Sequence, residues 1–229
     1  TGEGGSLSVE ERMSLATEWM NFSNQHLRVF VHVGHHALPD ALALASHAEG
    51  IGANAIAALA PGFFKPKGVE GLVNWCAEIA AAAPHLPFYY YHMPTMNGVD
   101  CKAYDFLCMA ATRIPNLAGI KFTHHEMDDY LMCCKFEDRR YDILWGRDEV
   151  LLGALAMNAT GAVGSTYNVM APLYLQMIEA FSEGKFDVAG SHQMSASQII
   201  STLVGTGHYL LTLKILLRKM GVPISPRVR

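Results

Sequence analysis

Short apolar segments alternate with longer amphipathic ones along the whole chain, and this alternation limits the folds that it can adopt. The short segments are rich in β-branched and aromatic residues, as strands are, whereas the longer ones repeat apolar residues at helical spacing. Six strands are predicted, at residues 28–33, 54–60, 86–91, 118–123, 141–145 and 160–165. Because successive strands recur every roughly 20 to 33 residues with a helix between them, they should pair in parallel as βαβ units. The sequence therefore predicts an α/β protein.

Helices are predicted before, between and after these strands. Ser8-x-x-Glu11 has the form of a capping box and marks the start of the first helix, and Pro39 begins the second. Apolar periodicity predicts the others at residues 69–83, 101–113, 126–136 and 148–157, and three more within residues 167–220.

A barrel fits this pattern better than an open sheet. No strand is followed by a Gly-x-Gly-x-x-Gly or Gly-x-x-x-x-Gly-Lys-Ser/Thr pattern, so the nucleotide-binding forms of the open sheet find no support. A (β/α)8 TIM barrel closes with eight strands, so we expect this chain to lack the first two. Residues 1–166 should form the barrel portion, with exposed strand edges, and residues 167–229 should add C-terminal helices within the same structural unit.

Composition excludes several classes of function. The 17 basic and 21 acidic residues are spread along the chain, without the dense basic stripe that nucleic acid would require. No apolar run reaches the roughly 18 residues of a membrane span, and no leader pattern begins the chain, so no membrane partner is expected. The five cysteines contain no Cys-x-x-Cys pair, which favours reduced, mostly buried thiols and a cytoplasmic location.

Lys121 is the first candidate catalytic residue. It lies in a predicted strand with apolar neighbours, where desolvation should disfavour the ammonium form and lower the pKa of the amine. A neutral amine can attack a ketone and form an imine. The alternative is a lysine that extends to solvent or pairs with a buried carboxylate.

Tyr91 is the second candidate. It ends the strand that precedes the one with Lys121, so its hydroxyl could reach a substrate bound at that lysine. Because side chains alternate along a strand, Tyr89 and Tyr91 should share one face. The alternative is a core tyrosine whose hydroxyl is satisfied within the fold.

Polar residues also follow the next two strands, at the edge where a barrel carries its reactive groups. Asp148 and Glu149 come after strand 141–145, and they could bind hydroxyl groups or cap the following helix. The segment 161–168 turns from apolar to polar in the same way and includes Ser165.

Six ordered motifs identify a resemblance that runs from residue 1 to about 225. They are Thr1-Gly-Glu3, His32-Val-Gly34, Tyr91-His-Met-Pro94, Gly119-Ile-Lys121, Gly146-Arg-Asp-Glu149 and Gly164-Ser-Thr-Tyr-Asn168. Together they resemble the N-acetylneuraminate lyase branch of the class I aldolase family that also contains dihydrodipicolinate synthase.

The resemblance implies a carbon-carbon lyase that acts on sialic acid and pyruvate, forms homotetramers and needs no cofactor or metal. Lys121 would form the imine with the 2-keto carbon, Tyr91 would shuttle the proton of the sugar C4 hydroxyl, and Thr1 would help to bind the pyruvyl carboxylate. The rest of the sugar would be held by Thr123, Gly146, Asp148, Glu149 and Ser165.

Two comparisons with the family pattern refine this expectation. The dihydrodipicolinate synthases usually have an arginine just after the segment that matches Tyr91 to Pro94, and here residues 95–97 are Thr-Met-Asn, which favours the sugar substrate. Many relatives carry a tyrosine that completes a proton relay across a subunit boundary, where this chain has Phe63 and Phe64. The cross-subunit phenol is therefore in question.

Three alternatives remain open at this point. The shortened chain could be a non-catalytic or impaired form of such a lyase, or an aldolase that acts on another 2-keto acid by the same imine. The third is a metal-dependent barrel hydrolase, because histidines gather at predicted strand ends: His32, His35, His36, His92, His124 and His125.

Overall fold

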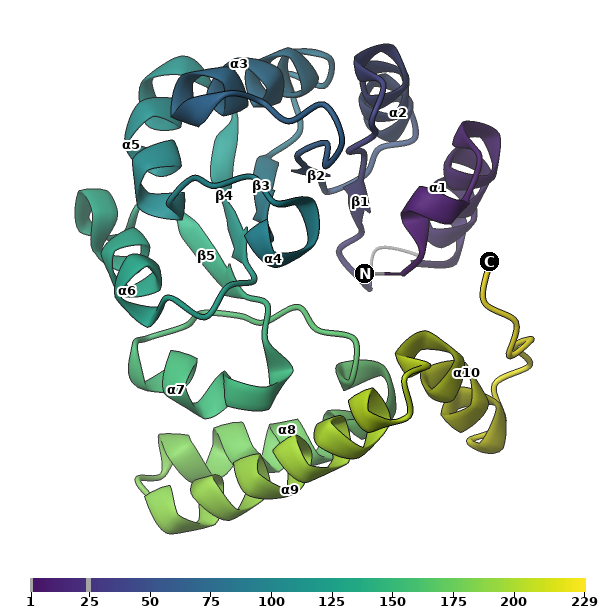
Figure 1. Ribbon diagram of the computed structural model, residues 1–229, viewed down its shortest axis with the longest axis vertical. Helices are drawn as coiled ribbons and strands as arrows, with labels where there is room; N and C mark the ends of the chain where they lie inside the picture. The colour runs from purple at the N-terminus through teal and green to yellow at the C-terminus, as the bar shows by residue number, and fades with distance from the viewer. Residues whose placement is uncertain (1, 24–25) are drawn as a thin grey trace. The chain divides into compact units, whose positions relative to one another are not determined.

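A parallel sheet lies at the centre of the computed structural model, which describes residues 2–23 and 26–229 (Figure 1). Within these residues one five-stranded sheet has the order β1-β2-β3-β4-β5, and the pairings from β1 to β4 are parallel. The strands are β1 (Phe30–His32), β2 (Ala55–Leu59), β3 (Phe88–His92), β4 (Leu117–Phe122) and β5 (Asp142–Trp145). Each strand lies beside its predecessor in the chain, as repeated βαβ units require.

The chain divides into two compact units, one of them Glu3–Leu144 and the other Trp145–Arg229 with Gly2. The sequence predicts a boundary at residue 166, between the barrel portion and the C-terminal helices. That boundary differs from the division into compact units, and it stays a prediction. In the first unit the helices follow one another along the outer side of the strands (Figure 1). They are α1 (Val9–Ser23), α2 (Leu38–Gly50), α3 (Gly68–Ala81), the single turn α4 (Pro94–Asn97), α5 (Ala103–Arg113) and α6 (Met127–Lys135), with 3-10 turns η1 (Gly4–Ser6) and η2 (Phe136–Arg139).

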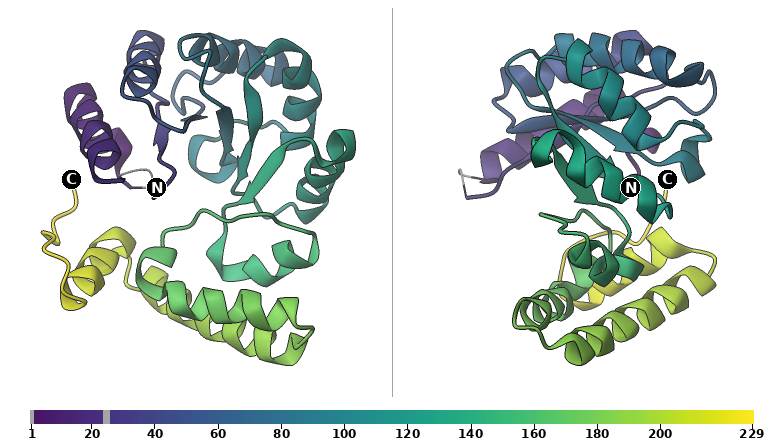
Figure 2. Two further views of the ribbon diagram at one scale, coloured as in Figure 1. Left: turned by 180° about the vertical axis from the view of Figure 1, so that it is seen from behind. Right: turned by 90° about the vertical axis from the view of Figure 1, so that its left-hand side faces the viewer.

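The second unit is helical. It contains η3 (Asp148–Val150), α7 (Leu151–Ala156), α8 (Tyr167–Ser182), α9 (Phe186–Gly205) and α10 (Tyr209–Lys219), and the last three are the helices predicted for residues 167–220. Helices α8 and α9 lie side by side as a hairpin (Figure 2). No single helix in the described part of the chain is long and apolar enough to cross a membrane, and α9 with α10 satisfies that criterion only as a pair bent by 117°.

The predicted start of the first helix is confirmed in detail. The Ser8 hydroxyl oxygen accepts a hydrogen bond from the Glu11 N–H at 3.2 Å, and the Ser8 N–H donates to a Glu11 carboxylate oxygen at 2.9 Å. These two reciprocal bonds form the capping box. Pro39 lies in the first turn of α2, also as predicted.

The sixth predicted strand, at residues 160–165, is wrong in extent. Only Ala162 forms a parallel bridge, with Trp145, and it rests on bonds from the Trp145 N–H to the Gly161 carbonyl and from the Val163 N–H to the Trp145 carbonyl. Strand β5 ends at Trp145, so it has no described residue left with which residues 163–165 could pair. The β-like composition of this segment therefore yields a bridge and no strand.

The three tyrosines of β3 are all buried, and they divide between two faces as their alternation predicts. The Tyr90 ring packs on Phe106 of α5 with ring centroids 4.3 Å apart. On the other face, the Tyr89 hydroxyl donates to the Asp142 carboxylate at 3.2 Å, and the Tyr91 ring lies near Lys121. The catalytic candidates are therefore on the face of the sheet opposite to α5.

The described cysteines are free thiols, as the sequence indicated. Cys76, Cys133 and Cys134 are buried, whereas Cys101 is half-buried and Cys108 is exposed. Burial raises the pKa of Cys133 and Cys134, because it disfavours the thiolate.

Gly119 allows β4 to approach β5 closely. A Cβ atom at this position would lie 1.9 Å from the Asp142 carbonyl oxygen and 2.9 Å from the Tyr89 ring. We predict that Gly119→Ala lowers the free energy of unfolding by about 1–3 kcal/mol, because backbone or ring must move to admit the methyl group. Chemical denaturation measures this change.

Gly190→Ala is the matched control, since Gly190 lies inside α9 and a Cβ there meets nothing within 4 Å. This variant should be neutral or more stable by roughly 0.5–1 kcal/mol. Equal stability of Gly119→Ala and the wild-type chain would contradict the steric argument.

Candidate active site

Lys121 and Tyr91 lie next to each other on neighbouring strands. They are register partners in the β3–β4 ladder, and the Lys121 Nζ atom is 4.0 Å from the centroid of the Tyr91 ring. Tyr91 is buried, whereas Lys121 is half-exposed. The expected proximity of the two residues is confirmed, and their catalytic roles stay predictions.

The hydroxyl group of Tyr91 makes a weak hydrogen bond. It donates to the Met93 sulfur at 3.1 Å, and a thioether is a poor acceptor. A substrate oxygen can replace this bond at little cost in free energy. A proton-transfer group must lie within hydrogen-bond reach of the reacting atoms, and Tyr91 lies beside the amine predicted to form the imine.

Thr123 follows the same strand two residues after Lys121. Its N–H donates to the His92 carbonyl at 2.8 Å, which continues the β3–β4 ladder beyond β4. Its hydroxyl oxygen is buried and has no hydrogen-bond partner among the described residues. A buried hydroxyl without a partner is costly, so this group is a candidate for ligand binding.

The remaining described candidates belong to the second unit, where Asp148 is held rigidly. One oxygen of its buried carboxylate, Oδ2, accepts hydrogen bonds from the N–H and the hydroxyl of Thr166, the former at 2.8 Å. The Thr166 hydroxyl gives its only proton to Asp148, so the Tyr174 hydroxyl must donate to Thr166, 2.7 Å away. Three buried polar groups thus form one chain of hydrogen bonds.

Gly164 fits closely against the same carboxylate. A Cβ atom at Gly164 would overlap Oδ1 of Asp148, so no larger residue can occupy this position without moving the aspartate. The motif 164–168 therefore folds around Asp148, and its glycine and threonine have a structural reason to be there.

Glu149 pairs with Arg147. The Nε and Nη2 atoms of Arg147 lie 2.9 Å and 2.6 Å from one oxygen, Oε1 of Glu149. Ser197 of α9 also donates to the Glu149 carbonyl, at 2.8 Å. Neither acidic side chain makes a capping hydrogen bond at η3. The Asp148 carboxylate bonds Thr166, and the Glu149 carboxylate bonds Arg147. Gly146, just before this pair, is half-buried.

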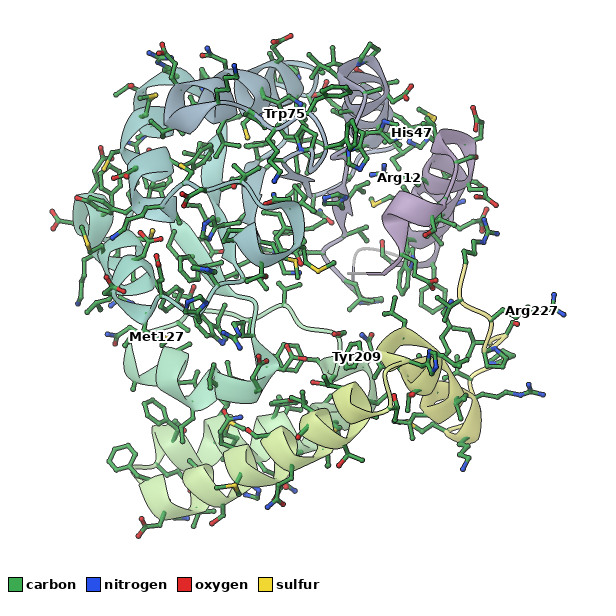
Figure 3. The ribbon with its side chains drawn as sticks, in the orientation of Figure 1. Arg12, His47, Trp75, Met127, Tyr209 and Arg227 are labelled. Atoms are coloured by element: carbon green, nitrogen blue, oxygen red, sulfur yellow. The ribbon has the colours of Figure 1, made fainter. Side chains whose placement is uncertain are left out.

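Ser165 contacts a residue that sequence reasoning missed. Its hydroxyl oxygen lies 2.9 Å from the hydroxyl of Tyr209, the first residue of α10, which is labelled in Figure 3. Arg147, Thr166 and Tyr174 were also missed as partners of the predicted residues. Thr166 and Arg147 lie within motifs that the sequence analysis used, whereas nothing in the sequence links Tyr209 to Ser165, 44 residues away. Thr1 lies outside the described residues.

The histidines do not support a metal centre. Among residues 2–23 and 26–229, no group of three or more His, Cys, Asp or Glu side chains is arranged to hold a metal ion. Their ring nitrogens make other contacts: His32 with the Leu59 N–H, His92 with the Cys101 carbonyl and His35 with Asp40. The described residues thus offer the metal-hydrolase alternative no set of ligands.

Comparisons with known proteins agree with this geometry. All of the chain, residues 1–229, matches the dihydrodipicolinate synthetase family. N-acetylneuraminate lyase A of Xenopus laevis is 41% identical over 228 residues, which are 99% of this chain and 74% of that protein. The solved N-acetylneuraminate lyase of Proteus mirabilis has a TM-score of 0.95 and 38% identity, and covers 100% of this chain and 77% of its own.

A third comparison is with the solved catalytic lysine mutant of the Ruminococcus gnavus sialic acid aldolase, which has a TM-score of 0.86 and 30% identity over 93% of this chain and 71% of its own. The predicted α/β class, a TIM-barrel fold with C-terminal helices, is confirmed by these matches. The chain belongs to the dihydrodipicolinate synthetase family.

Proposed function

We propose that this chain is a Schiff-base aldolase that cleaves N-acetylneuraminate, a sialic acid, to N-acetylmannosamine and pyruvate. The observation that carries the proposal is the placement of the Lys121 amine 4.0 Å from the Tyr91 ring on paired strands. Similarity to N-acetylneuraminate lyases over 99% of the chain supports this choice of substrate within the family.

The proposed reaction begins at Lys121. Its amine attacks the 2-keto carbon of the substrate, water leaves, and a protonated imine forms. The imine accepts the electron pair of the breaking C3–C4 bond, so an enamine forms in place of an unstabilised carbanion. Tyr91 relays the proton of the C4 hydroxyl as the sugar aldehyde leaves. The enamine then takes up a proton at C3, and hydrolysis releases pyruvate and restores Lys121.

The substrate-binding roles remain proposals for each residue. The buried hydroxyl of Thr123, which has no hydrogen-bond partner in the described part of the chain, supports a role in substrate binding. In the second unit, the fixed carboxylate of Asp148 and the Arg147-bound Glu149 suit a polyhydroxylated tail, because preorganised acceptors lose little freedom on binding. Gly146 and Ser165 would contribute to the same binding, and Thr1 would help to bind the pyruvyl carboxylate.

We also propose a cytoplasmic homotetramer that uses no cofactor. Free thiols among the described cysteines fit a reducing compartment. Large apolar side chains that remain exposed, including Phe63, Phe64, Leu175 and Met194, provide surface that subunit contacts would cover. Light scattering on the purified chain measures the oligomeric state.

The first test is reductive trapping of the imine. Incubation with pyruvate and borohydride should give a stable mass adduct that peptide mapping places on Lys121, and Lys121→Ala should lose both the adduct and lyase turnover. Lys135→Ala, at the exposed end of α6, is the matched control and should retain both. A folded wild-type chain that forms no adduct, or normal turnover by Lys121→Ala, would refute the proposal.

Tyr91→Phe tests the proton relay. This variant keeps the ring beside Lys121 and removes only the hydroxyl, so imine trapping should be nearly unchanged. The kcat for cleavage should fall by about 10²–10⁴-fold, the contribution of a positioned acid-base group. Steady-state kinetics and trapping on the same sample measure the two effects. Equal losses of trapping and turnover would mean that Tyr91 acts on imine formation.

Thr123→Val tests the buried hydroxyl. Because this group has no partner among the described residues, its removal should leave thermal stability unchanged or raised. The KM for N-acetylneuraminate should rise by roughly 5–10-fold, the worth of one hydrogen bond. The control is Thr112→Val on α5, whose hydroxyl donates to the Met109 carbonyl, and it should leave KM unchanged. An unaltered KM in Thr123→Val would rule out this contact.

A further inference from the structure

The imidazole ring of His32, the last residue of β1, is bonded to the backbone of β2. Its Nε2 atom accepts a hydrogen bond from the Leu59 N–H at 3.1 Å. Gly34 is close to this bond, since a Cβ atom there would lie 3.1 Å from Cε1 of His32 and 2.8 Å from the Leu59 nitrogen. The ring therefore occupies space that exists only because residue 34 is glycine.

The bond to Leu59 takes the place of a backbone bond. The Val33 N–H donates to the Ala57 carbonyl, and in a parallel ladder the Leu59 N–H would next bond the Val33 carbonyl. The His32 side chain accepts that hydrogen bond instead. Nε2 must be unprotonated to do so, and a neutral imidazole then carries its proton on Nδ1.

Arg12 further disfavours a charge on this ring. Its buried guanidinium group donates from Nη2 to the His32 carbonyl at 2.8 Å, and the same atom is 3.5 Å from Nδ1 of His32. Desolvation lowers the pKa of His32 to about 3, and the cations of Arg12 and Lys121 act in the same direction. Part of the side chain still reaches solvent at the edge of the sheet, so the bond at Nε2 is the firmer reason for its neutrality.

The anchored ring meets Tyr91. The centroids of the two rings are 6.1 Å apart and their planes are nearly perpendicular, at 88°. The Tyr91 ring thus makes an edge contact with the His32 imidazole, and the Lys121 amine lies over the face of the same Tyr91 ring. Both contacts constrain the tyrosine ring, and His32 is itself bonded to the backbone of a third strand, β2.

We propose that His32 is a positioning residue: anchored as a neutral ring to the Leu59 N–H, it fixes the Tyr91 ring beside Lys121. The inference rests on the proposed function, since it acts through the residue assigned there to proton transfer. Its effect should appear in the step that uses the Tyr91 hydroxyl and not in imine formation.

His32→Leu tests the proposal, because leucine has similar bulk and no acceptor for the Leu59 N–H. We expect the kcat for N-acetylneuraminate cleavage to fall by about 10-fold or more, with KM and pyruvate trapping on Lys121 changed less than about 2-fold. His32→Gln should restore most of the kcat, since an amide oxygen can accept the same bond. If His32→Leu does not fold, His32→Phe replaces it, with the same expected loss of kcat.

A double-mutant cycle separates positioning from a general structural effect. In a Tyr91→Phe background, His32→Leu should lower the residual kcat by less than about 2-fold, because there is no hydroxyl left to position. His85→Gln is the control, a change at an exposed histidine before β3, and it should not alter kcat. Unchanged kcat in the folded His32→Leu or His32→Phe variant overturns the proposal, as does a full loss in the Tyr91→Phe background.

One readout does not depend on turnover. Nitrogen spectra of selectively labelled histidine should show His32 neutral, with its proton on Nδ1, from about pH 5 to about pH 8. The ring signals of labelled Tyr91 should shift in His32→Leu and return in His32→Gln. A His32 that titrates in this range, or unshifted Tyr91 signals, overturns the inference, whereas absent wild-type turnover overturns only the proposed function.

Discussion

The parallel pairing of β3 with β4 is the constraint on which the candidate site depends. Register partners in neighbouring strands project from the same face, so the Tyr91↔Lys121 pairing brings a phenol and an amine together. No loop conformation is needed for this meeting, because backbone hydrogen bonds fix it. A slip of the register by one residue would turn one of the two side chains toward the helices.

Three glycines in the sequence motifs allow neighbouring atoms to lie closer to the backbone than a side chain would permit. A Cβ atom would collide with the Leu59 backbone at Gly34, with the Asp142 carbonyl at Gly119 and with the Asp148 carboxylate at Gly164. Each glycine lies within a few residues of a candidate functional side chain. The motifs therefore record packing requirements as well as chemistry, since the backbone must come close wherever a polar side chain is fixed.

The two units hold their polar candidates in different ways. Lys121 and Tyr91 are set on strands, and Thr123, just after β4, keeps a buried hydroxyl without a partner among the described residues. Asp148, Glu149 and Ser165 each bond a side chain of their own unit, respectively Thr166, Arg147 and Tyr209. Such bonds reduce the freedom of a side chain before a ligand arrives, which lowers the entropic cost of binding.

Sequence reasoning predicts the α/β order, the capping box at Ser8, the shared face of Tyr89 and Tyr91, and the candidate lysine, because each depends on local periodicity or on a short motif. The single bridge formed by the segment at 160–165 could not be predicted in this way, since it depends on where β5 ends in the folded chain. Tertiary structure also decided the contacts of Ser165 with Tyr209 and of His32 with Leu59, which join residues 44 and 27 positions apart. Such pairs cannot be predicted from periodicity or a short motif, because only the folded chain brings the two residues close together.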